Sequence, residues 1–170
     1  MNALSPLGGI HAEYFPLSHT ALITYLCVVP EMRRRGISEL LLGQIVSVLR
    51  KNAAGASIPI FAEAEDPAKL PDSASQQTAY RRLSILSRLG FREIPIKYRQ
   101  PALGPGKNPV DYLKFLVFSP GSPDTVKSST VRAFMHEFYK GLDAGEPDDA
   151  RTLAGLIADD IPTVALEGHT

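Results

Sequence analysis

The chain has 170 residues, of which 44% are hydrophobic and 21% charged, and its basic and acidic side chains are equal in number. A net charge of zero gives no global electrostatic reason to expect nucleic acid or an anionic membrane as a partner. The single cysteine, Cys27, excludes an intrachain disulfide and a thiolate metal cluster. Because no apolar run reaches the length of a membrane span and the N-terminus lacks the pattern of a signal peptide, we expect a cytoplasmic protein.

Two strands joined by a turn are predicted at the start of the chain. Residues 9–15 alternate between apolar and polar side chains, which is typical of a strand with one buried face. Residues 21–28 carry no charge and are rich in β-forming residues, so we expect a strand that is buried on both faces. The short turn at 16–20 predicts an antiparallel hairpin. Pro30 ends its second strand, because proline lacks the N–H that a ladder requires.

A basic turn that contains glycine follows the hairpin and opens into an amphipathic helix. Arg33, Arg34, Arg35 and Gly36 precede apolar residues at helical spacing, which predict a helix ending near 52–55. The first N–H groups of a helix have no intrahelical partners and carry the positive end of its dipole, so this turn is suited to a phosphate or pyrophosphate. The plainer alternative is an ordinary strand-to-helix connection with a solvated basic loop.

The middle of the chain predicts an α/β fold in which helices pack on a mixed sheet. A second apolar run, 58–64, is interrupted by Glu63, and a loop rich in proline, aspartate and serine follows it. A helix is then expected to run to Leu89 and to end at Gly90 as its C′ residue. This alternation of strands and helices favours a mixed sheet. Two further strands are predicted at 91–96 and 110–118.

A segment rich in serine, proline and glycine at 119–124 is the best candidate for a domain boundary. We expect a core over 1–120 and a C-terminal helical extension over 121–170 that packs against the core and adds to its sheet. Two helical stripes and a last strand are predicted in this extension: Val131, Phe134, Met135, Phe138 and Leu142; then Leu153, Leu156 and Ile157; then a strand within 161–166.

Two motifs resemble those of the GNAT superfamily of acyltransferases. Residues 30–38, Pro-Glu-Met-Arg-Arg-Arg-Gly-Ile-Ser, are similar to its acyl-CoA signature Arg/Gln-x-x-Gly-x-Gly/Ala, with Ser38 where glycine or alanine is commoner. Ser38 is small and is suited either to cap the helix or to donate to a phosphate oxygen. Residues 86–91, Leu-Ser-Arg-Leu-Gly-Phe, resemble a helix end that usually reads Tyr-x-x-x-Gly-Phe.

This resemblance implies a GNAT-like fold with a mixed, mostly antiparallel central sheet over about 9–118, here without the family's usual N-terminal elements. It implies that acyl-CoA, most simply acetyl-CoA, is the cofactor. The turn would hold its pyrophosphate, and the strand before the turn would pair with pantetheine. The residues implied in this binding are Leu26, Cys27, Val28, Arg33, Arg34, Arg35, Gly36, Ile37 and Ser38.

The resemblance further implies direct attack of an amine on the thioester. The strand over 25–28 is then expected to diverge from its neighbour, and its N–H groups would polarise the thioester carbonyl. Glu63, a lone carboxylate in an apolar strand, is the candidate general base, with its pKa raised by burial. A hydrogen-bonded structural glutamate is the alternative role. Glu13, His11 and Tyr25 are weaker candidates for the base.

Three functions are consistent with these features. The first is an N-acyltransferase that moves acetyl from acetyl-CoA to a small-molecule or peptide amine. The second is a non-catalytic acyl-CoA-binding or sensing module, favoured because Leu86 stands where the family's proton-donating tyrosine is usual and cannot donate a proton. The third is a structural dimer whose basic turn attracts only stray anions; a homodimer is compatible with each. The four histidines lack the spacing of metal ligands, so no metal site is predicted.

Overall fold

The computed structural model describes residues 5–104, 106–118, 124–142 and 160–166. The strands of the main sheet, in their spatial order, are β1 (Gly8–Phe15), β2 (Thr20–Val28), β3 (Ile60–Glu65), β5 (Leu113–Phe118), β4 (Arg92–Glu93) and β8 (Val164–Ala165). Among the described pairs, β2 and β3 run parallel and the others antiparallel. The mixed, mostly antiparallel sheet that the sequence predicted is therefore confirmed.

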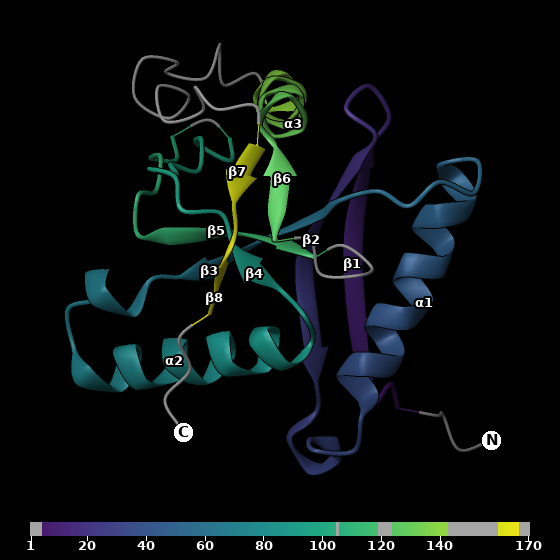
Figure 1. Ribbon diagram of the computed structural model, residues 1–170. Helices are drawn as coiled ribbons and strands as arrows, with labels where there is room; N and C mark the ends of the chain where they lie inside the picture. The colour runs from purple at the N-terminus through teal and green to yellow at the C-terminus, as the bar shows by residue number, and fades with distance from the viewer. Residues whose placement is uncertain (1–4, 105, 119–123, 143–159, 167–170) are drawn as a thin grey trace.

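Three helices and a small second sheet complete the described fold (Figure 1). The helices are α1 (Ile37–Asn52), α2 (Ser73–Arg88) and α3 (Ser128–Gly141), and two single 3-10 turns, η1 (Pro30–Met32) and η2 (Pro67–Lys69), precede the first two of them. The second sheet is made of β6 (Thr125–Lys127) and β7 (Asp160–Pro162).

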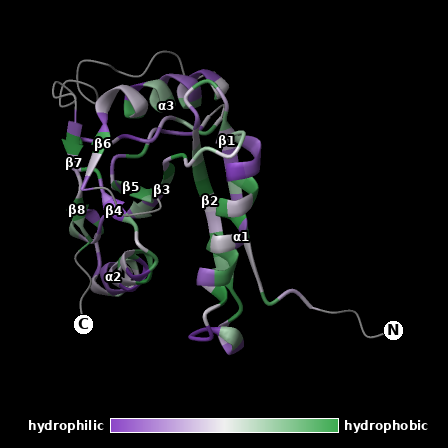
Figure 2. Ribbon diagram, turned by 45° about the vertical axis from the view of Figure 1, so that its right-hand side comes forward, coloured by the Kyte–Doolittle hydropathy of each residue, from purple (hydrophilic) through white to green (hydrophobic). Residues whose placement is uncertain are grey.

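The helices cover opposite faces of the sheet because its strands alternate. Ile60 and Ala62 of β3 pack with Leu42 of α1 and Leu83 of α2 in one buried cluster. Phe61, which lies between them in sequence, belongs to a second cluster. Successive strand residues point to opposite faces, so α1 and α2 lie on one face and α3 on the other. Figure 2 shows hydrophobic and hydrophilic residues alternating along α1, as a helix with one face on a sheet requires.

The predicted helix ends are confirmed by their capping residues. Helix α1 ends at Asn52, and Gly55 has a φ of 89° shortly after it. Asp72 caps the start of α2 by accepting a hydrogen bond from the Ser75 N–H at 2.9 Å. Gly90, at a φ of 91°, ends that helix as expected for a C′ glycine.

Two predicted strands are shorter than expected. The strand predicted at 91–96 forms a ladder only over Arg92–Glu93, because Pro95 has no N–H to donate and the chain turns after it. The strand predicted at 110–118 begins at Leu113, and Val110 makes only an isolated bridge to Gln100.

The prediction that 21–28 is buried on both faces is wrong for its second half. Ala21, Leu22 and Ile23 are buried, whereas Tyr25 is 73% exposed and Cys27 is exposed. The cause is the limited pairing of β2 with β3, which ends at Ile23. Beyond that residue, the face of β2 opposite α1 is open in the described part of the chain.

The C-terminal residues contribute to both sheets. The strand predicted within 161–166 is divided into β7 and β8, and the latter pairs with β4. Thr163 lies between the two strands and accepts hydrogen bonds from Arg92, at 2.6 Å on its hydroxyl and 3.0 Å on its carbonyl. The first predicted helical stripe is α3, whose apolar residues are buried. The second stripe and the 119–123 linker lie outside the described residues, so the division at 120 stays a prediction.

The turn of the first hairpin is held by one carboxylate of α3. Glu137 accepts from the N–H groups of Leu17, at 3.1 Å, and Ser18, at 2.8 Å, and from the Ser18 hydroxyl at 2.8 Å. The Ser18 hydroxyl also lies 2.9 Å from that of Thr20, which is fully buried. A residue 120 positions away in sequence therefore satisfies the donors of this turn.

Replacement of this carboxylate is expected to destabilise the protein. Glu137→Ala removes three acceptor contacts to the turn, and we expect the free energy of unfolding to fall by about 1–3 kcal/mol. Chemical denaturation measures this change. Lys140→Ala, at an exposed position of the same helix, is the matched control and should change stability by less than about 0.5 kcal/mol. Equal effects of the two variants would contradict the assigned role of Glu137.

Candidate functional site

The central feature of the site is the separation of β2 from β3. These strands are paired only through Ala21–Ile23 and Ile60–Ala62. On its other edge, β2 stays paired with β1 up to Val28, but an irregularity in register leaves Thr24 as an extra residue. Such a bulge bends its strand, and Figure 1 shows β1 and β2 running away from β3 and β5. The predicted divergence over 25–28 is therefore present, and it exposes two strand edges that face each other.

A basic turn lies directly beyond the end of β2. Arg33, Arg34 and Arg35 are exposed, and the Arg33 Nε donates to the Val28 carbonyl at 3.3 Å. Gly36 is the residue before α1 and has a φ of 73°, in the left-handed region that favours glycine. Because the N-cap residue is this glycine, it provides no side-chain hydrogen bond to the start of α1. The first turn of α1 and three consecutive arginine residues therefore follow the end of β2 closely along the chain.

The residues predicted to bind the cofactor occupy this region in different ways. Ser38 does not cap the helix, because α1 begins at Ile37 and the capping position is Gly36, two residues before Ser38; donation from Ser38 to a phosphate oxygen stays a prediction. Ser38 and Ile37 are half-buried in the first turn. Leu26 packs against the core under α1, whereas Cys27 is exposed. The side chains at 26–28 therefore have different surroundings. What these residues share is a backbone that does not pair with β3.

Glu63 lies one residue beyond the last pair between β2 and β3, where the two strands begin to separate. It is half-buried and accepts two hydrogen bonds, from the Tyr98 hydroxyl on Oε1 and from the Gln100 amide on Oε2 at 2.6 Å. Burial raises the pKa of the Glu63 carboxyl above its usual value, while both hydrogen bonds act in the opposite direction. The predicted direction of this pKa change is confirmed.

Tyr98 is a functional candidate that the sequence does not reveal. Burial, followed by the nearby Glu63 carboxylate, raises the pKa of its phenol well above the usual value, so this hydroxyl stays protonated and donates. Tyr98 and Gln100 follow β4 in a stretch between two proline residues, Pro95 and Pro101, and no periodicity there indicates a buried side chain. Only the isolated carboxylate of Glu63, which needs a partner when buried, provides a signal that such donors exist.

The other predicted acid-base candidates lie on the open side of the hairpin. His11, Glu13 and Tyr25 are exposed on β1 and β2, and the His11 Nδ1 lies 2.7 Å from the Thr24 hydroxyl. Leu86 is partly buried against the core between the sheet and α2. Leu86 therefore contributes to packing and provides no hydroxyl group at this position.

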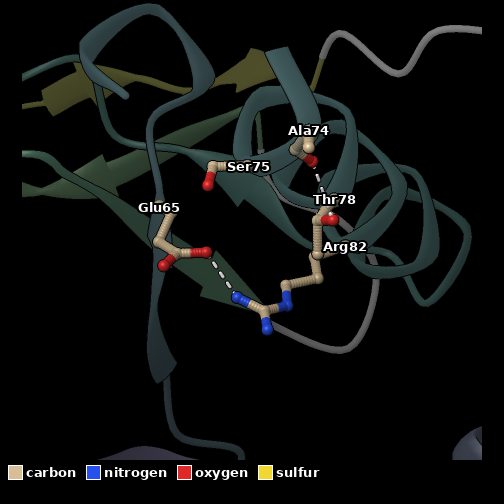
Figure 3. A pocket seen from close by; sticks show the side chains of 5 residues that line it. All are labelled: Glu65, Ala74, Ser75, Thr78 and Arg82. Atoms are coloured by element: carbon tan, nitrogen blue, oxygen red, sulfur yellow. Dashed lines mark hydrogen bonds and ion pairs between the residues drawn. The ribbon is translucent and has the colours of Figure 1, made fainter. Parts of the chain in front are cut away.

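A cavity of about 280 Å³ opens beside Glu65 at the end of β3, where β3 is no longer paired with β2 (Figure 3). Figure 3 shows Arg82 of α2 reaching to Glu65, with which it makes an ion pair. Ser75 and Thr78 add hydroxyls, and that of Thr78 donates to the Ala74 carbonyl at 2.9 Å. The side chains that line this cavity form a polar surface between α2 and the end of β3.

Two kinds of site are not found among the described residues. No group of three or more His, Cys, Asp or Glu side chains there is placed to hold a metal ion. None of the helices in the described ranges is both long and apolar enough to cross a bilayer.

No model of a known protein family matches the sequence, and no curated protein matches it. Several solved structures are similar. A proposed GNAT-family acetyltransferase from Bacteroides thetaiotaomicron is 22% identical, with a TM-score of 0.48, over 66% of this chain and 54% of that one. Ard1 from Thermoplasma volcanium is 16% identical with a TM-score of 0.41, over 66% and 62% of the two chains. Nourseothricin acetyltransferase is 20% identical with a TM-score of 0.41, over 66% and 57%.

The chain therefore spans 54% to 62% of the length of these three structures.

The pKa of Glu63 predicts how stability depends on pH. Because folding raises this pKa above the usual value of 4.5, ionisation of Glu63 costs stability as pH rises through the folded-state pKa. Glu63→Gln cannot ionise, so we expect the free energy of unfolding of this variant, minus that of the wild type, to increase from about pH 4 to about pH 8. Denaturant titrations across this range measure it. Glu13→Gln, at an exposed position of β1, controls for the loss of a surface carboxylate; a flat difference for Glu63→Gln would contradict the assigned burial.

Proposed function

We propose that the protein is an acyl-CoA-dependent N-acyltransferase, which uses acetyl-CoA and transfers the acetyl group to an amine. The observation that carries this proposal is the continuity of two features. The half of β2 that is not paired with β3, over 24–28, leads through η1 into a basic turn and the start of α1. A ligand that fits both must combine an extended chain of amides with an anionic group, and acyl-CoA has both.

The chain's groups suit the two ends of this ligand. Pantetheine carries two amides, which can pair with a free strand edge as an added strand would. The diphosphate would be held by the N–H groups at the start of α1 and by Arg33, Arg34 and Arg35. Gly36 allows the backbone to approach the phosphates closely. The binding set from Leu26 to Ser38 is thus proposed as a continuous path.

The transfer itself needs a base at the point where the strands separate. Bound acyl-CoA supplies an activated thioester. In our proposal Glu63 takes the proton that the amine loses as its nitrogen attacks the carbonyl carbon, and N–H groups of 26–28 polarise the carbonyl. The C–S bond then breaks, and the thiolate takes a proton from water. A thiol pKa of about 8.5 makes thiolate a good leaving group, so the lack of a hydroxyl at Leu86 does not prevent the reaction.

The non-catalytic alternative is less well supported. A sensing module would need the anion site and the strand edge, but it would have no use for an ionisable, half-buried carboxylate at the opening.

The acceptor would approach from the side of β1 and β2 that bears Tyr25 and His11, both of them exposed. A small-molecule or peptide amine fits this open face, and a homodimer remains part of the proposal.

Binding is tested by calorimetry with CoA and with acetyl-CoA. We expect both to bind the wild-type chain, and the Arg34→Ala/Arg35→Ala variant to bind at least about tenfold more weakly, since hydrogen bonds to charged groups contribute about 1.5–3 kcal/mol. Lys51→Ala, at the other end of α1, removes a charge of the same sign and should leave affinity unchanged. Absence of heat with either ligand would rule out the proposed cofactor site.

Catalysis is tested by thiol release from acetyl-CoA over a panel of amines. The wild type is expected to release thiol in an amine-dependent way. Glu63→Gln should lower this rate by about 10²–10⁴-fold while acetyl-CoA affinity is retained, because only the general base is lost. Tight binding without turnover on any amine would instead favour the sensing module.

A further inference from the structure

The carboxylate of Glu63 is held at both of its oxygens. Tyr98 donates to Oε1, and Gln100 donates to Oε2 at 2.6 Å. A carboxylate oxygen has two lone pairs, so each keeps one for an incoming proton. Two donors on different oxygens also fix the rotation of the carboxylate plane, which a single hydrogen bond would leave free.

The two donors are themselves fixed by contacts that do not involve Glu63. The Tyr98 ring stacks on Phe115 of β5, with ring centroids 4.8 Å apart and planes at 21°. Gln100 exchanges two backbone hydrogen bonds with Val110, at 2.8 and 3.0 Å. Between them, the Arg99 carbonyl accepts from the Tyr139 hydroxyl of α3 at 2.7 Å. The donors would therefore keep their positions even if the carboxylate were removed.

We infer that Tyr98 and Gln100 are positioning residues, which hold the Glu63 carboxylate in a fixed orientation at the opening between β2 and β3 so that it can accept the proton of an amine. This inference rests on the proposed role of Glu63 as the base. It assigns a role in the reaction to the segment 98–100, which neither sequence motif includes.

The physical reason is the conflict between burial and ionisation. A buried carboxyl without donors is protonated more readily and cannot act as a base near neutral pH. Each hydrogen bond to the carboxylate favours its charged form. The titratable groups on this side of Glu63 are Tyr98 and, behind it on α3, Tyr139, and the former stays protonated. Phe115, the cross-strand partner of Glu63, lies on the same face of the sheet and adds an apolar side chain beside the carboxylate.

A purely structural alternative exists, in which Glu63 merely satisfies the buried Tyr98 hydroxyl. The two readings differ in what removal of a donor does. In the structural reading, a variant lacking the phenol loses stability, and the titration of Glu63 has no consequence for the rate. In the positioning reading, the titration of Glu63 and the acid limb of the rate move together.

The experiment follows the Glu63 carboxyl carbon by NMR across pH, and the pH profile of kcat/KM for thiol release, in Tyr98→Phe and Gln100→Leu. Each variant is expected to move both titrations to higher pH. The rate of each variant relative to the wild type should be about tenfold lower at acid than at alkaline pH, as expected for loss of one hydrogen bond to a charged group. Tyr139→Phe, which removes a buried hydroxyl from the neighbouring Arg99 and not from Glu63, is the matched control and should leave both midpoints in place.

The outcomes separate this inference from the function on which it rests. A wild-type chain without amine-dependent thiol release would overturn the proposed function, while the NMR titration still reports on the two donors. An active wild type whose acid limb stays in place in Gln100→Leu would overturn the positioning role. The Gln100 variant carries the test if Tyr98→Phe does not fold, because Gln100 is half-buried and its backbone bonds remain.

Discussion

The architecture of the candidate site follows from the limited pairing of two parallel strands, which extends over only three residue pairs. β2 and β3 are joined from Ala21 to Ile23 and then separate, while β2 remains bound to β1. If the pairing continued to Val28, the backbone groups would be satisfied by the sheet itself and no ligand could use them. The bulge at Thr24 bends β2 at that point, so the separation is built into the hairpin. The proposed site depends on this opening, since Glu63 lies where the strands begin to separate and the basic turn follows the far end of β2.

Glu63 shows how a sheet can hold a charged group that its interior would otherwise reject. The strand is apolar around it, with Ala62 and Ala64 buried on the opposite face under the helices. Burial alone favours the protonated carboxyl, whereas the phenol of Tyr98 and the amide of Gln100 favour the carboxylate. The resulting balance leaves the pKa raised but the group hydrogen-bonded on both oxygens, which is a suitable state for an exchangeable proton.

The sequence indicates local features well and distant contacts poorly. The hairpin, the helix over 37–52 and the αL glycine after the second helix could be predicted, because periodicity and capping residues are local properties. The divergence at 25–28 could be predicted only through the family resemblance. The apolar residues around Cys27 predict a buried strand, because a sequence does not show that β2 pairs with β3 over only three residues. Tyr98 and Gln100 could not be identified, since their relation to Glu63 arises from strand order across more than thirty residues.

Helix α3 contacts two parts of the fold that are distant in sequence, although it lies beyond the residues that carry the two sequence motifs. Glu137 binds the tip of the β1–β2 hairpin, and Tyr139, two residues later on the same helix, binds the Arg99 carbonyl beside the donors to Glu63. One helix thus links the turn of the first hairpin to the segment that donates to Glu63. A displacement of α3 would therefore disturb the hairpin turn and the 98–100 segment at the same time.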